Sequence, residues 1–144
     1  MAFMPQLNAA GTAWIPQLFD NNLGNQGVQG LLTRYGSGDV ANAAAVATIP
    51  AVASQTAYIT GFEVWAGGAT AAILVDVTIA GLLGGSQTFP FAAPAGAALA
   101  ANPLVFNFDQ PLPASAANTA ITVTLPALGA GNAKAAVYAK GYTA

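Results

Sequence analysis

Residues 71–80, AAILVDVTIA, decide the fold, because large apolar side chains occupy every second position from residue 73 onward. A period of two is that of a β-strand, in which successive side chains point to opposite faces of a sheet. Leu74, Asp76 and Thr78 share one face of this strand. We expect the other face to lie in a hydrophobic core, and it carries Ile73, Val75, Val77 and Ile79.

Similar runs of β-branched and aromatic residues occur on both sides of this strand, separated by Gly, Pro, Asn and Ser. Short strands at such spacing are typical of an antiparallel β-sandwich. Pro50 and Pro90 cannot donate to a central ladder, so Pro50 marks a strand boundary or an edge, and Pro90 marks an edge strand. The runs predict further strands at residues 45–49, 57–65, 86–91, 104–108, 120–125 and 133–142.

Two of these runs carry expectations about orientation. In the last strand, Lys134 and Lys140 are expected to guard a sheet edge against unwanted pairing. Residues 109–113, DQPLP, are expected to form a rigid crossing. Alternation through residues 57–65 predicts two faces of one strand. One face carries Tyr58, Thr60, Phe62 and Val64, and the other carries Ile59, Gly61, Glu63 and Trp65.

About eight short strands, joined by crossings as well as tight turns, predict an all-β fold. The expected architecture is a two-sheet sandwich of the jelly-roll or Greek-key type, spanning residues 43–144. An immunoglobulin-like sandwich is the alternative, although the Cys-Trp-Cys pattern of antibody domains is absent from this cysteine-free chain.

Residues 1–42 differ from the rest, because Asn, Gln, Pro and Gly recur there and neither strand nor helix periodicity persists. We expect an extended N-terminal arm. Its large apolar side chains are costly to leave in water, at about 25 cal/mol per Å². They are expected to dock either on the chain's own sandwich, as an edge strand or lid, or on a neighbouring subunit. Aromatic and Arg side chains are favoured interface anchors, so the candidates for inter-subunit contact are Trp14, Phe19, Arg34 and Tyr35.

The composition indicates an unusually neutral surface. Charged residues make up 6% of the 144-residue chain, hydrophobic residues reach 55%, and the formal net charge is -2. An ordinary soluble domain carries about 25% charged residues. Weak repulsion between copies suits a protein with permanent neighbours. Because much of the apolar content is Ala, a monomeric sandwich is the alternative.

The missing residue types argue against catalysis. The chain has neither His nor Cys, so it lacks the usual proton shuttle near neutral pH, the thiol nucleophile and the commonest zinc ligands. We therefore expect no enzymatic activity, no metal and no cofactor. The remaining alternative is a glycosidase-like carboxylate pair, Glu63 with Asp76, facing each other across a cleft.

Nucleic-acid binding and membrane insertion are not expected either. Three basic residues cannot build a phosphate-binding patch. Polar residues and glycines interrupt every apolar run before the roughly 18–20 residues that a membrane-spanning helix needs. The start of the chain has no Lys or Arg, so no secretory signal is expected and the chain should be made in the cytoplasm without processing.

Four short motifs carry a resemblance that extends from about residue 46 to the end: ITGFEV at 59–64, AGLLGG at 80–85, PLPAS at 111–115 and GAGN at 129–132. As a set they resemble the jelly-roll cement, or decoration, proteins found on the heads of tailed bacteriophages. The motifs are turn and strand punctuation and identify no active site. The arm lies outside the resemblance.

The resemblance implies a structural virion protein on the outer surface of an icosahedral capsid, made in the host cytoplasm. Its implied partners are the major capsid protein and further copies of itself, as a dimer or trimer, and its implied role is to stabilise contacts between capsid subunits. The competing hypothesis is a tail or receptor-binding module that recognises host glycan, with Trp65 beside Gly67 and Gly68 as a platform for a sugar ring.

Overall fold

The computed structural model describes residues 6–7, 14–15, 32–96, 103–129 and 134–144. The chain divides into two compact units, Met1–Leu31 and Leu32–Ala144. In the first unit, β1 (Gln6–Leu7) pairs antiparallel with β2 (Trp14–Ile15). The second unit begins before residue 43, because part of the segment expected as an arm is a strand of the sandwich.

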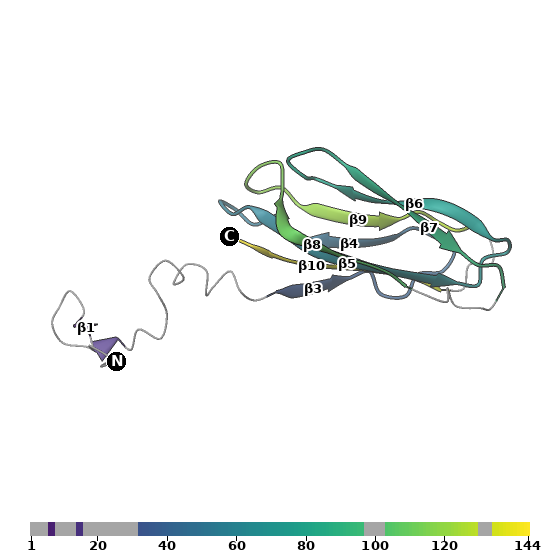
Figure 1. The fold of residues 1–144 in the computed structure, drawn as a ribbon, viewed down its shortest axis with the longest axis horizontal. Helices are drawn as coiled ribbons and strands as arrows, with labels where there is room; N and C mark the ends of the chain where they lie inside the picture. Colours follow the sequence, from purple (N-terminus) through teal and green to yellow (C-terminus); the bar gives the residue numbers. More distant parts are fainter. Residues whose placement is uncertain (1–5, 8–13, 16–31, 97–102, 130–133) are drawn as a thin grey trace. The chain divides into compact units, whose positions relative to one another are not determined.

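The second unit consists of two antiparallel sheets of four strands, and no helix occurs among the described residues (Figure 1). We call them the first and the second sheet. In spatial order the first sheet contains β3 (Thr33–Gly36), β10 (Lys134–Thr143), β5 (Ala57–Gly67) and β8 (Leu104–Pro113). The second contains β4 (Ala45–Ile49), β9 (Ile121–Leu125), β6 (Ile73–Ala80) and β7 (Gln87–Ala93).

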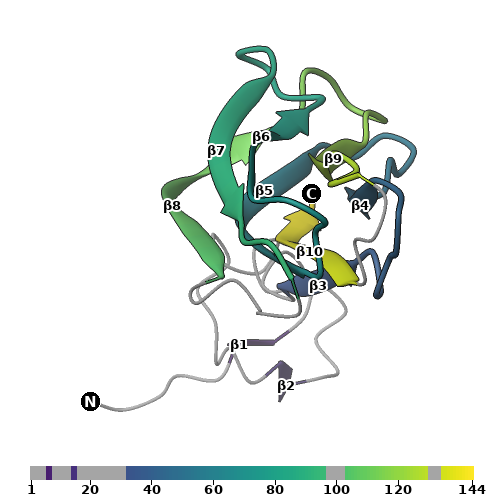
Figure 2. The same ribbon diagram turned by 90° about the vertical axis from the view of Figure 1, so that its right-hand side faces the viewer.

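Successive strands of this unit alternate between the two sheets. The exception is the pair β6 and β7, which are consecutive in the chain and adjacent in the second sheet. The free edges of the two sheets are β3 and β8 in the first, and β4 and β7 in the second. Figure 2 looks along the strands and shows β7 and β8 on the same side of the sandwich.

The core lies between the sheets and follows the predicted alternation most clearly in β4 and β9. Ala45, Ala47 and Ile49 of β4 are fully buried, and the residues between them are exposed. β9 repeats the pattern with Ile121, Val123 and Leu125. Within this sheet Ala45 lies beside Leu125 and Ala47 beside Val123, so small and large core side chains are neighbours in the ladder.

The prediction for residues 73–79 is confirmed for half of the strand. Val77 and Ile79 are fully buried, Val75 is half-buried and Ile73 is 38% exposed. β9 pairs only with Thr78–Ala80 of β6, so the first residues of β6 extend beyond the end of β9. Alternation therefore determines which side chains of β6 point inward, and the extent of pairing with β9 determines how deeply each of them is buried.

The predicted faces of residues 57–65 are wrong at one end. Ile59 lies in the core together with Phe62 and Val64, whereas Tyr58 shares the outer face with Glu63 and Trp65. The cause is a β-bulge: Lys140 pairs with Gly61 and Gly141 with Ile59, so Thr60 is an extra residue on β5. One inserted residue exchanges the two faces of a strand beyond it.

The prediction of a guarded edge at the last strand is also wrong. β10 is an inner strand, paired with β5 on one side and with β3 on the other. Residues Thr33–Gly36, expected in the arm, supply this second partner. Residues 109–113, expected as a crossing, continue β8 to Pro113 beyond an irregularity in its pairing with β5.

Candidate interaction surfaces

The outer face of the first sheet gathers charged and aromatic side chains from three strands. Arg34 comes from β3, Tyr138 and Lys140 from β10, and Glu63 and Trp65 from β5. They share a face because Arg34 is opposite Lys140 and Tyr138 is opposite Glu63 in the ladders. We call these five residues the polar face.

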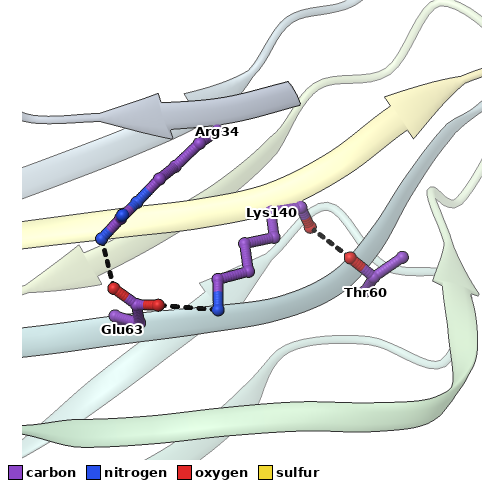
Figure 3. A network of polar contacts seen from close by, with 4 residues as sticks. All are labelled: Arg34, Thr60, Glu63 and Lys140. Atoms are coloured by element: carbon purple, nitrogen blue, oxygen red, sulfur yellow. Dashed lines mark hydrogen bonds and ion pairs between the residues drawn. The ribbon is translucent and has the colours of Figure 1, made fainter. Parts of the chain in front are cut away.

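Glu63 is the centre of the polar face and pairs with two cations (Figure 3). The guanidinium of Arg34 reaches across β10 and donates to Oε2 of Glu63, while Nζ of Lys140 lies 2.6 Å from Oε1. The Thr60 hydroxyl, on the bulge residue, donates to the carbonyl oxygen of Lys140 at 3.1 Å. The Thr60 hydrogen bond and the Lys140–Glu63 ion pair therefore join β5 to β10, and the Arg34–Glu63 ion pair joins β5 to β3.

The two cations determine the protonation of Glu63. The hydrogen bond from Lys140 is the largest cause that lowers the pKa of this carboxyl below its ordinary value of 4.5, and the charges of Lys140 and Arg34 act in the same direction. Partial burial raises the pKa and offsets part of this effect. Glu63 is therefore ionised at neutral pH and acts as an acceptor for both cations.

Tyr138 carries the aromatic part of the polar face. The Arg34 guanidinium carbon lies 4.2 Å from the centre of its ring, and the Trp65 ring is stacked at 6.4 Å with an interplanar angle of 16°. Gly36 makes room for this arrangement, because a Cβ there would lie 2.7 Å from the Tyr138 ring. The Tyr138 ring therefore lies between the Arg34 guanidinium and the Trp65 ring.

A second aromatic pair lies at the other end of β5 and β10. Tyr58 and Tyr142 are opposite in the ladder, and their rings are stacked at 5.1 Å with an interplanar angle of 16°. Burial, and to a smaller extent the neighbouring Tyr58, raises the pKa of the Tyr142 hydroxyl above its ordinary value. The Tyr142 hydroxyl is therefore a neutral, hydrogen-bonding group at neutral pH.

The second surface is a cluster of phenylalanines between β8 of the first sheet and β7 of the second, which we call the phenylalanine seam. Phe106 lies 4.9 Å from Phe89 and 5.1 Å from Phe108, measured between ring centres. Phe62 contacts Phe89 at 5.0 Å and Phe106 at 5.9 Å. These rings join the two sheets where each sheet ends at an edge strand.

The phenylalanine seam is partly open to solvent. Phe62 is fully buried, but Phe106 is 38% exposed although it points toward the core. On the outer face of β8, Val105 is 48% exposed. The opposite side of the sandwich differs, because the inward side chains of β4 are fully buried. Other apolar side chains of this unit are more exposed, with Leu74 at 72% and Leu83 at 67%. The β8 edge is distinguished by Phe106, an aromatic ring that points toward the core and is still partly exposed.

The structure separates the residues predicted for inter-subunit contact. Arg34 lies on the polar face with its side chain 54% exposed, and Tyr35 points the other way and packs on the core. For Trp14 the structure describes the backbone pairing with Leu7, and Phe19 lies outside the described residues. The phenylalanine seam was not predicted from the sequence, although its signal is Phe at alternate positions next to Pro90 and in residues 104–108.

The carboxylate pair considered for glycosidase chemistry is not brought together. Glu63 lies on the outer face of the first sheet, and Asp76 alternates with core residues of β6 and points out of the second. Within the described ranges, no group of three or more His, Cys, Asp or Glu residues could hold a metal ion. In the same ranges there is no helix long and apolar enough to span a membrane.

The chain was compared with known protein families, curated proteins and solved structures. No model of a known protein family matches the chain, and neither curated proteins nor solved structures provide a match.

Proposed function

We propose that this chain is a structural subunit that works by packing against other proteins, as a capsid decoration protein on the outside of a phage head. The observation that carries the proposal is the exposed apolar edge of β8, with Val105 48% and Phe106 38% exposed. A β-sheet edge of this kind is normally protected in a protein that functions alone. The same surface is suitable for burial against a permanent partner.

The strand order supports a jelly roll as the architecture. The first of the eight strands, β3, pairs with the last, β10, and moving inward along the chain, β4 pairs with β9, β5 with β8 and β6 with β7. This nesting is what results when one long antiparallel hairpin folds over into two sheets. It agrees with the fold that the resemblance to cement proteins implies, although a fold by itself assigns no function.

The charge distribution supports an assembly role as well. Lys134 pairs with Asp39, and Arg34 and Lys140 share Glu63, so each cation of the described residues lies beside a carboxylate. The resulting surface has a weak long-range field and gives little repulsion between neighbouring copies. Many such copies on a lattice can sum weak contacts into a stiff shell.

The proposal is tested by cosedimentation of the purified chain with capsid shells that lack it, followed by heat or a chaotrope. Binding at the stoichiometry of the shell lattice, with a higher disruption threshold, is the expected result. A chain that stays in the supernatant and leaves the threshold unchanged contradicts the proposal.

A glycan-binding module is the second candidate, and the polar face favours it. Trp65 is a half-buried aromatic residue on this face whose ring is stacked on Tyr138, and Arg34 and Glu63 nearby can hydrogen-bond sugar hydroxyls. Oligosaccharides released from host surface polysaccharide would then raise the melting temperature of the chain. Trp65→Leu should abolish that shift, and Tyr142→Leu in the separate tyrosine pair should leave it unchanged.

A further inference from the structure

We infer that β8 is the surface through which two copies of this chain associate, by antiparallel pairing of residues 104–108 with the same residues of a second copy. The pairing joins two first sheets into one continuous sheet. The inference deepens the proposed function and rests on it, because it names a second copy as the partner that covers the exposed apolar edge.

Among the free edges, β8 is distinguished by what it exposes. β3 is four residues long and carries Arg34, and β7 is interrupted by Pro90. β4 is free of charge and Pro, but its inward side chains are fully buried. Residues 104–108, LVFNF, combine high strand propensity, no charge and no Pro with an inward ring, Phe106, that is 38% exposed.

No described strand covers this edge of β8. In the part of the chain that the structure describes, β8 pairs with β5 and is the last strand of the first sheet. The backbone groups on its other side are therefore available for a ladder with another chain. Asp109 and Pro111 limit the usable length at one end, and Pro103 limits it at the other.

The sequence of this window is complementary to itself. An antiparallel pair centred on Phe106 places Phe106 opposite Phe106 of the second copy, Leu104 opposite Phe108, and Val105 opposite Asn107. Leu104, Phe106 and Phe108 point toward the core side in each copy, so apolar side chains meet apolar side chains. The window contains no charge, so the pairing brings no like charges together.

Other registers use the window less well. A shift that keeps inward side chains on the same side moves the centre to Val105 or Asn107, because the side-chain period is two. The first shift brings Pro103 opposite Asn107, and the second brings Asp109 opposite Val105 and Pro103 opposite Pro111. Centring on Phe106 therefore pairs all five residues and buries both phenylalanine seams against each other, in a two-fold contact.

Cysteine pairs test the register on the full chain, which has no Cys of its own. Val105→Cys and Asn107→Cys are made separately, and the two proteins are mixed and oxidised. Directly opposite positions are within reach of a disulfide, whereas each variant alone places its two cysteines about 7–8 Å apart on the diagonal. The expected result is a covalent dimer in the mixture and little in either variant alone.

The matched control is on β4. Val46→Cys and Thr48→Cys have the same spacing on the outer face of the other uncharged edge strand, and their mixture should not crosslink. Sedimentation velocity then compares Val105→Lys with Val46→Lys. The lysine on β8 should weaken self-association roughly tenfold or more, and the lysine on β4 should leave it unchanged.

Crosslinking in the mixture together with loss of the dimer in Val105→Lys supports the inference. A mixture that crosslinks no faster than its components, or a Val105→Lys variant that dimerises normally, overturns it. Shell binding is measured in parallel to separate the two proposals. Binding to shells without pairing through β8 would support the proposed function and contradict the pairing. Pairing through β8 without binding to shells would support the pairing and contradict the proposed function.

Discussion

The two outer faces of the sandwich follow the same strand alternation and have opposite chemistry. The first sheet presents the polar face, with its ion pairs and stacked rings. The second sheet presents mainly threonine and aliphatic side chains, among them Leu74 at 72% exposure, with Asp76 as its charged residue in the described ranges. Across its strands one row runs through Val46, Thr124, Thr78 and Thr88.

The difference shows that alternation determines which residues face outward but does not determine which partners their side chains contact. The polar face is held together by side chains that are distant in sequence, such as Arg34 with Glu63 and Glu63 with Lys140. The threonine rows rely on contacts between direct neighbours in the ladder. Substitutions should therefore cost more on the first sheet than on the second.

The largest effect is expected for Gly36→Ala, because the added methyl group would displace the Tyr138 ring from the polar face. The added Cβ would lie 2.7 Å from the Tyr138 ring, so the ring must leave its position between Arg34 and Trp65. We expect a loss of about 1–2 kcal/mol in the free energy of unfolding and a change in the near-UV circular dichroism. Gly84→Ala is the control, because a Cβ there meets nothing within 4 Å. Equal behaviour of the two variants would contradict the packing argument.

Glu63→Gln tests the charge at the centre of the polar face. At neutral pH it should cost about 1 kcal/mol, since both cations lose their carboxylate partner in a partly exposed site. The folded pKa of Glu63 is depressed, so its stabilisation is complete above 4.5 and is lost as the pH falls through the folded value. Urea titrations of both proteins should therefore differ at neutral pH and converge in acid.

Asp76→Asn is the comparison on the second sheet. Asp76 makes no ion pair with any described residue, so this variant should not reproduce the neutral-pH difference. A pH-independent gap between wild type and Glu63→Gln would count against the ion pairs as its cause.

Arg34→Lys should have a smaller effect, because it keeps the positive charge and removes the planar group above Tyr138. A loss of about 0.5–1 kcal/mol is expected from the weaker contact with the ring. Thermal unfolding measures it, with Lys134→Arg in the exposed pair with Asp39 as the control. If the two exchanges have the same effect, the ring contact contributes nothing specific.

Thr124→Val should have the smallest effect. The change keeps the shape and strand propensity of the side chain on the outer face of β9, so stability should stay within about 0.5 kcal/mol of wild type. Chemical denaturation tests this. A loss well above that range would show that the threonine hydroxyls are bonded across the strands, and the contrast between the two outer faces would then be smaller than proposed.

Much of the sandwich was predictable because its signal is local. The predicted strand at 45–49 agrees with β4, and the edge position indicated by Pro90 is that of β7. The predicted strand at 120–125 contains β9. In each case the side-chain period and a proline report directly on backbone geometry.

The candidate surfaces were less predictable because they depend on pairing. Arg34 was predicted as an inter-subunit contact of the arm. Its partners in the structure, Glu63 and Tyr138, lie on strands far along the chain. The bulge at Thr60 placed Tyr58 outside and Ile59 inside, against the simple alternation. The phenylalanine seam requires knowing that β7 and β8 end their sheets on the same side.

The sequence by itself determined an all-β chain of low charge with apolar side chains at every second position, since these properties follow from composition and a period of two. The tertiary structure decided which strands are neighbours. Residues 33–36 made β10 an inner strand, and the absence of a described partner left the phenylalanines of β8 at a free edge. The physical reason is that strand pairing is a long-range choice, stabilised by hydrogen bonds and packing that local periodicity does not encode.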